Sequence, residues 1–162
     1  MDNDLFNDFA RAVVAIVFEQ GVQVLEPRPS GDVGTEFPLG APVHIVTAYN
    51  PRGLASDEAA NVEYHHALLA DVKALGVMSI PTVGSARDGS MEEPGLLLVG
   101  LDRPAALSLG RKYSQSAIYE WQSDRLTLLG ALDTGVAVLG WRLEKLETPP
   151  EARKAHPSAT RP

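Results

Sequence analysis

Two polar residues that could do chemistry stand directly before a proline in this sequence, Glu93 and Asn50. A loop carboxylate such as Glu93 can act as a general base or bind a cationic or hydroxyl group. Its structural alternative is a salt bridge to Arg52 or Arg87. The favoured interpretation of Asn50 is structural, because Asn side chains readily form hydrogen bonds that fix turns. Glu93 is therefore the one candidate base, and whether the protein is an enzyme stays open.

A polar amide lies on the inward stripe of a predicted helix. Asn61 falls at helical spacing with Tyr64, Leu68, Val72 and Leu75. A buried amide without a partner is costly, so we expect Asn61 either to brace the backbone around Asn50 or to point into a pocket. Tyr113 and Gln115 follow a second predicted helix, where Gln can cap exposed carbonyls and the Tyr ring can pack. Contact with a ligand is the alternative for both.

Several other kinds of site are excluded by the residues present. The chain has no cysteine, which excludes disulfides, thiolate catalysis and cysteine-ligated zinc. His65 and His66 point about 100° apart on a helix and lack a third ligand, so we expect no metal. The loop from residue 84 to 90 lacks the spacing and lysine of a phosphate-binding loop. No cofactor is therefore expected.

Charge and hydropathy narrow the partners and the compartment. The net charge is -7, and residues 147–162 carry three basic and two acidic groups, so the rest carries -8. Nucleic-acid binding needs clustered Lys and Arg, so neither nucleic acid nor an anionic membrane is expected. The longest strongly apolar run, from residue 12 to 18, is far shorter than the roughly 20 residues that span a bilayer. The acidic start of the chain is unlike a secretion signal, and a cytoplasmic location is expected.

The elements that must position these residues follow from periodicity and turn signals. The pattern predicts a helix over 2–11, a loop over 27–42, and helices over 56–75, capped by Ser56, and 103–112. Strands are predicted over 43–49, 77–83, 96–99, 117–121, 126–129 and 136–143. Residues 12–26 form either a hairpin, which we favour, or a continuation of the first helix. We expect one domain over 1–146 and a flexible tail over 147–162.

The middle of the chain reads β-α-β-β-α-β, which is the order of a ferredoxin-like α+β fold. We expect an antiparallel sheet with both helices on one face and extra strands from both termini. Pro81 argues that its strand lies at an edge. In this topology we expect one end of the domain to gather the polar motif residues: Asn50, Arg52, the start of the first helix near Asn61, the loop from Gly84 to Glu93, and Tyr113 with Gln115.

Short motifs in the same region resemble a known family. They are Thr47-Ala48-Tyr49-Asn50-Pro51, the helix residues Asn61 and Leu68, the pair Glu93-Pro94, and Tyr113-Ser114-Gln115-Ser116-Ala117-Ile118. Over residues 43 to about 121 the chain resembles the uncharacterised bacterial domain-of-unknown-function family 3293. The family usually has Tyr-Gly-Gln where this chain has Tyr113-Ser114-Gln115. The resemblance implies no reaction, ligand or partner.

Two hypotheses of different classes follow. The first is a binding domain for a small polar ligand, recognised by Asn50, Arg52, Asn61, Glu93, Tyr113 and Gln115. The second is a protein-interaction module or homodimer that pairs through exposed sheet edges near residues 13–25 and 121–141. An enzyme with Glu93 as its base is a further alternative.

Overall fold

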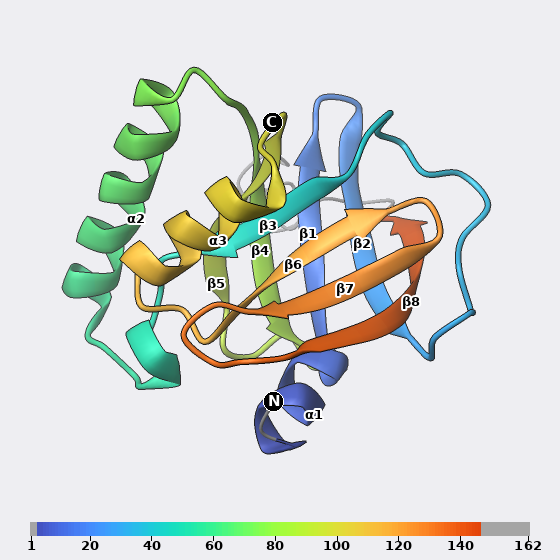
Figure 1. Ribbon diagram of the computed structural model, residues 1–162, viewed down its shortest axis with the longest axis horizontal. Helices are drawn as coiled ribbons and strands as arrows, with labels where there is room; N and C mark the ends of the chain where they lie inside the picture. Colours follow the sequence, from blue (N-terminus) through green and yellow to red (C-terminus); the bar gives the residue numbers. More distant parts are fainter. Residues whose placement is uncertain (1–2, 147–162) are drawn as a thin grey trace, which may run out of the picture.

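Eight antiparallel strands form a closed barrel in the computed structural model, which describes residues 3–146 (Figure 1). Around the barrel the order is β1-β2-β8-β7-β6-β3-β5-β4. The strands are β1 Ala12–Phe18, β2 Gly21–Arg28, β3 Val43–Thr47, β4 Met78–Ala86, β5 Glu93–Val99, β6 Ala117–Gln122, β7 Arg125–Gly130 and β8 Val136–Lys145. The predicted tail over 147–162 lies outside the described residues.

The predicted ferredoxin-like sheet is wrong, because the sheet does not stop at the strands of the β-α-β-β-α-β segment. β1 pairs with β4 over residues 12–16 and 82–86, and also with β2. β2 pairs with β8, and β8 pairs with β7, which closes the ring. Pairing between strands so distant in sequence leaves no mark in a period-two pattern, so the closure could not be read from the chain.

The N-terminal hairpin is correct, and the alternative of a long first helix is not. β1 and β2 are joined through Gly21, whose φ of 139° suits a glycine in a tight turn. Pro81 does not lie on an open sheet edge, because it pairs with Leu96 of β5. No hydrogen bond to β1 is lost by the proline. β1 pairs with β4 only from Thr82 onward, so the missing N–H of Pro81 falls beyond the last β1 partner.

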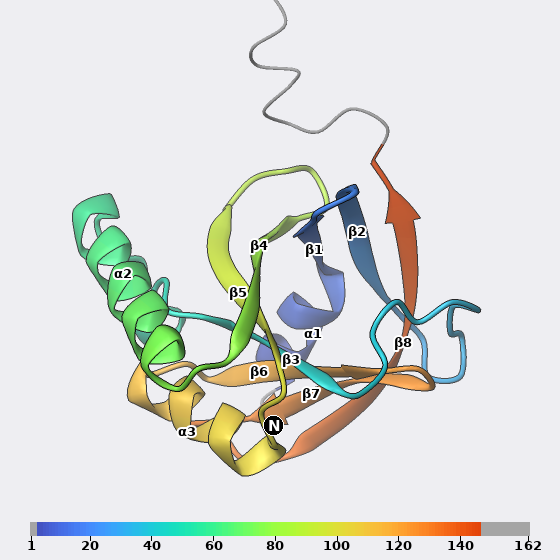
Figure 2. The same cartoon turned by 90° about the horizontal axis from the view of Figure 1, so that it is seen from above.

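Two helices cover the outside of the barrel, and a third lies at one of its ends (Figures 1 and 2). α2 (Glu58–Ala74) and α3 (Arg103–Lys112) pack Leu68, Val72 and Leu109 against the outward side chains of β3, β5 and β6. Asp57 caps α2 in place of the predicted Ser56, and Asp57 Oδ1 accepts the Ala60 N–H at 2.8 Å. None of the described helices is long and apolar enough to cross a membrane.

The inside of the barrel holds a separate apolar core. Trp121 and Trp141 meet edge to face with ring centres 5.2 Å apart, and Phe37 packs against Trp121 at 5.0 Å. The helix α1 (Asn3–Arg11) adds Phe6 and Phe9 to this core from the barrel end. Large aromatic side chains therefore fill the part of the barrel around the two tryptophans.

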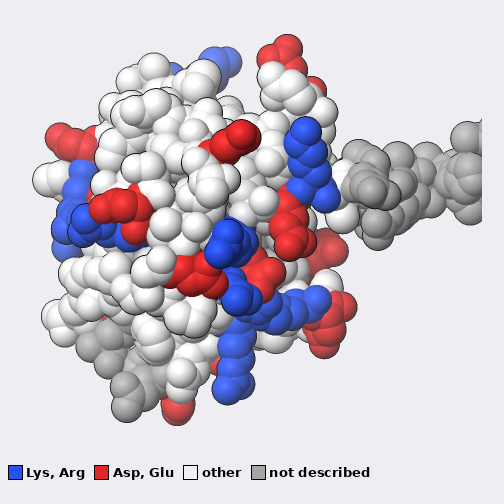
Figure 3. All heavy atoms as spheres, turned by 90° about the vertical axis from the view of Figure 1, so that its right-hand side faces the viewer, with Lys and Arg blue, Asp and Glu red and all other residues white. Residues whose placement is uncertain are grey.

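Opposite charges alternate on the side of the barrel formed by β2 and β8, to the right in Figure 1. Figure 3 shows that side, where basic and acidic side chains are interleaved. Glu26 forms ion pairs with Arg28 and Arg87, and Asp32 with Arg28 and Arg142. This side of the molecule therefore offers no continuous basic surface.

Candidate functional site

A cavity of about 440 Å³ lies inside the barrel next to α1. Its walls come from β1, β3, β4, β5 and β6, from the segment after β3, and from α1. Small residues leave the space, since Gly84, Ala86, Gly95 and Ala117 stand at lining positions. Tyr119 lines this cavity, and Trp121, two residues farther along β6, belongs with Tyr119 to the same apolar core.

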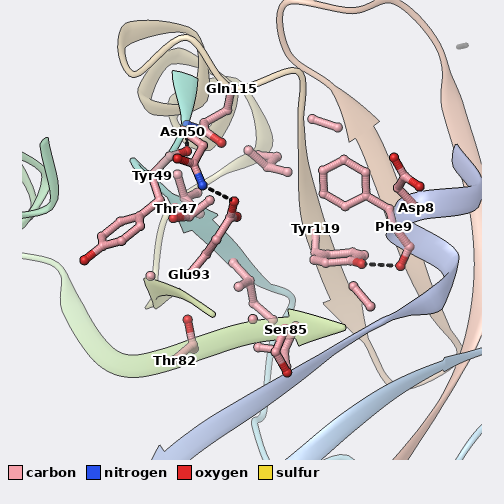
Figure 4. Close-up of a pocket in the computed structure, with 18 of the residues that line it drawn as sticks. Asp8, Phe9, Thr47, Tyr49, Asn50, Thr82, Ser85, Glu93, Gln115 and Tyr119 are labelled. Carbon is pink, nitrogen blue, oxygen red and sulfur yellow. Dashed lines mark hydrogen bonds between the residues drawn. The ribbon is translucent and has the colours of Figure 1, made fainter. Parts of the chain in front are cut away.

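One wall of the cavity carries a carboxylate that is held by an amide. Asn50 Nδ2 donates to Glu93 Oε1 at 2.8 Å (Figure 4). The amide oxygen of Asn50 accepts from the Ser56 N–H at 3.1 Å and from Asn61 Nδ2 at 2.9 Å. Both bonds to this oxygen require the Asn50 NH₂ group to face Glu93. Asn61 itself lies behind this wall as the predicted brace.

The Glu93 carboxylate has no cationic partner among the described residues. The structural alternative, a salt bridge to Arg52 or Arg87, is not formed, because Arg87 binds Glu26 at 2.7 Å and Arg52 is exposed. Burial raises the pKa of Glu93, and the hydrogen bond from Asn50 offsets part of that rise. Glu93 thus offers the cavity a partly desolvated carboxyl group with one protein donor.

A second polar group on the same wall is the hydroxyl of Thr82. Thr82 is only 3% exposed, lines the cavity, and has no hydrogen-bond partner for its side chain among residues 3–146. It lies on β4 opposite Gly95, and Gly84 lies opposite Glu93. Thr82 and Glu93 are therefore diagonal neighbours on adjacent strands, both on the inner face (Figure 4).

The facing wall is aromatic. The Tyr119 hydroxyl donates to the Phe9 carbonyl at 2.8 Å, and the two rings meet edge to face at 5.6 Å. Tyr119 is 5% exposed, and burial raises its pKa. Because its hydroxyl is engaged by α1, Tyr119 presents an apolar ring to the cavity and fixes α1 across the barrel end (Figure 4).

Gln115 also lines the cavity, at the point where α3 leads into β6. Its Nε2 donates to the carbonyls of Tyr49 and Tyr113, each at 3.1 Å. The bond to Tyr113 caps the end of α3, as predicted from the sequence. These two bonds tie the α3–β6 connection to the strand end at Tyr49, so that Gln115 has a structural function beside any contact with a ligand.

Three of the six residues predicted to bind a ligand do not line the cavity: Asn61, which lies behind its wall, and Tyr113 and Arg52, which make contacts elsewhere. The Tyr113 hydroxyl donates to Asp71 on α2, and Lys112 pairs with the same carboxylate at 2.8 Å. Arg52 has an exposed side chain, and its backbone N–H donates to the Ser114 carbonyl at 2.7 Å. The structure thus brings Asn50, Glu93 and Gln115 together on the cavity and places Asn61 behind them.

The sequence motifs do not include several residues that complete the cavity. Thr82 and Tyr119 lie within predicted strands, where nothing in the pattern distinguishes them from core residues. Asp8 and Phe9 belong to α1, which no sequence signal directs to this end of the barrel. In the described chain no group of three or more His, Asp or Glu side chains could hold a metal ion.

The comparisons with known proteins agree with the resemblance noted above. Residues 46–118 match the model of a family described as "Protein of unknown function (DUF3293)", which confirms that resemblance. The matched segment contains Asn50, Asn61, Thr82, Glu93 and Gln115, but not α1. Neither a curated protein nor a solved structure matches the chain.

Proposed function

We propose that the cavity inside the barrel binds a small ligand with hydrogen-bonding polar groups. The observation that carries this proposal is the pair of polar side chains on one wall, Glu93 and Thr82, which face a cavity of about 440 Å³ with few protein partners of their own. Ligand pockets are commonly a few hundred cubic ångströms in volume, mostly apolar, with a small number of fixed polar groups. Unpaired buried polar groups are costly unless a ligand or water satisfies them.

The arrangement of the wall supports binding in a fixed orientation. Asn50 and Asn61 hold the Glu93 carboxylate through a chain of hydrogen bonds, so little side-chain entropy remains to be lost when a ligand binds. The facing rings of Tyr119 and Phe9 supply apolar surface. A ligand with one polar end and one apolar end would match both walls.

A catalytic role for Glu93 is a second candidate, favoured by one observation. Burial raises the pKa of this carboxyl, and a general base works best when its pKa approaches the working pH. Thr82 and Gln115 would then orient a substrate. Catalysis would add a reaction to the same binding event.

The alternative of a protein-interaction module loses the observation that motivated it. Each of the eight described strands has a neighbour on both sides, so the sheet edges expected near 13–25 and 121–141 are already paired. A homodimer through another surface remains a separate hypothesis.

Thermal unfolding against a panel of nucleotides, amino acids and sugars tests the proposal. A ligand present at about a hundred times its Kd should stabilise the protein by roughly 2.7 kcal/mol. Thr82→Val removes the hydroxyl at similar volume, and Gly84→Val places a side chain in the cavity; both should reduce the shift. Arg52→Ala and Tyr113→Phe lie outside the cavity and should keep it. A shift that survives Gly84→Val and Thr82→Val would contradict binding in the barrel.

A further inference from the structure

Resting on the proposed function, we infer that the ligand presents a cationic nitrogen, an ammonium or amidinium group, to Glu93 and a flat apolar body to Tyr119 and Phe9. Glu93 is partly buried, and its one hydrogen-bond donor among the described residues is the neutral amide of Asn50. A carboxylate that has lost water and has no counter-ion is stabilised most by a cation.

The other charged groups around the cavity do not supply Glu93 with a counter-ion. The charged side chains that line it are Glu93, Asp8 and Arg11, which sum to a net charge of -1. Arg11 is exposed at the end of α1, and none of the ion pairs among the described residues joins it to Glu93. The chain as a whole carries -7. Both the local and the overall field favour entry of a cation over an anion.

The neighbouring groups fit the rest of such a ligand. The Thr82 hydroxyl stands diagonally across from Glu93 on the same wall and can accept a second N–H. An amidinium group carries several N–H donors in one plane, so it can bind the two oxygens of the Glu93 carboxylate together. The Tyr119 ring lies across the cavity with its hydroxyl already bonded to Phe9. Its apolar surface suits an aromatic or aliphatic body, and cations near aromatic faces gain further attraction.

Three probes of nearly equal shape and different charge test the inference: benzamidine, benzamide and benzoate. Isothermal titration near neutral pH should give benzamidine about a tenfold lower Kd than benzamide, because hydrogen bonds to charged groups are stronger than neutral ones. Benzoate should bind most weakly. Glu93→Gln keeps the side-chain shape without the charge and should abolish the preference for benzamidine over benzamide. Tyr113→Phe, outside the cavity, should retain that preference.

The outcomes separate this inference from the proposed function. Equal or tighter binding of benzamide or benzoate, or a benzamidine preference that survives Glu93→Gln, would overturn the inference. If Gly84→Val then abolishes binding of benzamide or benzoate, the cavity is still the binding site. Only the inference that its ligand is a cation is then wrong. Failure of benzamidine to bind at millimolar concentration also overturns the inference. The ligand panel with Gly84→Val decides the proposed function independently.

Discussion

Asn50 and Asn61 are joined by two hydrogen bonds, one in each direction. The Asn50 backbone N–H donates to Asn61 Oδ1 at 2.8 Å, and Asn61 Nδ2 donates to Asn50 Oδ1 at 2.9 Å. Asn50 Nδ2 is thereby left to donate to Glu93. Asn61 thus sets the position of the Glu93 carboxylate although it does not line the cavity.

Asn61→Ala should destabilise the protein by about 1–3 kcal/mol. Asn61 is 4% exposed, and its removal leaves the Asn50 N–H without its partner in a partly buried place. Urea unfolding measures the change in free energy. Glu63→Ala, at an exposed position of the same helix, is the matched control and should change stability by less than about 0.5 kcal/mol. An equal effect of the two variants would contradict the bracing role of Asn61.

Gly84→Ala and Gly95→Ala should change stability in opposite directions. A Cβ at Gly84 would meet only the Glu93 carbonyl at 3.8 Å, so alanine should stabilise the strand by about 0.5–1 kcal/mol. A Cβ at Gly95 would lie 2.7 Å from the Val46 carbonyl oxygen and 3.1 Å from Thr82 Oγ1, and should cost about 1–3 kcal/mol. Denaturant midpoints of the two variants give the comparison. Loss of stability in both would show that the space beside Gly84 is not free.

Ser114→Gly should stabilise the protein by about 0.5–1 kcal/mol. Ser114 follows the last turn of α3 and has a φ of 54°, a left-handed conformation that costs a non-glycine residue roughly 1–2 kcal/mol. Part of the gain is lost because glycine is freer in the unfolded chain. Ser116→Gly, two residues on and without a positive φ, should lower stability in the same unfolding assay.

The local elements could be predicted because their signals are local. Pro104 at the first turn and the start at Arg103 fix α3 as predicted, and the β-branched run after residue 12 gives β1. The closure of the barrel could not be predicted, since it depends on β1 finding β4 across the whole β3–α2 region. Topology predicts which loops gather at one end of the domain, but it does not predict which single side chains there face the cavity.

The candidate site was predicted in part for the same reason. Asn50, Glu93 and Gln115 follow or precede strands at turns, where polar residues stand out from their neighbours. Arg52 was misplaced because its φ of 61° turns the chain toward Ser114 instead of the cavity. Thr82 was missed because an inward polar residue within a strand has the same period as an apolar one.

The stability of the protein should depend on the ionisation of Glu93. Burial raises the pKa of this carboxyl in the folded state above its unfolded value, while the bond from Asn50 offsets part of the rise. Between those two values the folded protein holds more protons, so the contribution of Glu93 is full below the unfolded pKa and falls as pH rises through the folded pKa. Glu93→Gln cannot ionise. Its free energy of unfolding, relative to the unmodified protein, should therefore increase from about pH 4 to about pH 7.

A second carboxyl supplies a control of opposite sign in the same series of urea titrations. The ion pair with Lys112 and the bond from Tyr113 lower the pKa of Asp71, so its contribution is present above the unfolded pKa and is lost as pH falls through the folded value. With the series extended below the ordinary Asp pKa of about 3.8, Asp71→Asn should lose stability relative to the unmodified protein as pH rises through that acidic range. Glu93→Gln should gain between about pH 4 and about pH 7. A flat difference for Glu93→Gln beside the expected slope for Asp71→Asn would show that Glu93 is well solvated. The carboxyl would then lack the desolvation on which its role in the cavity depends.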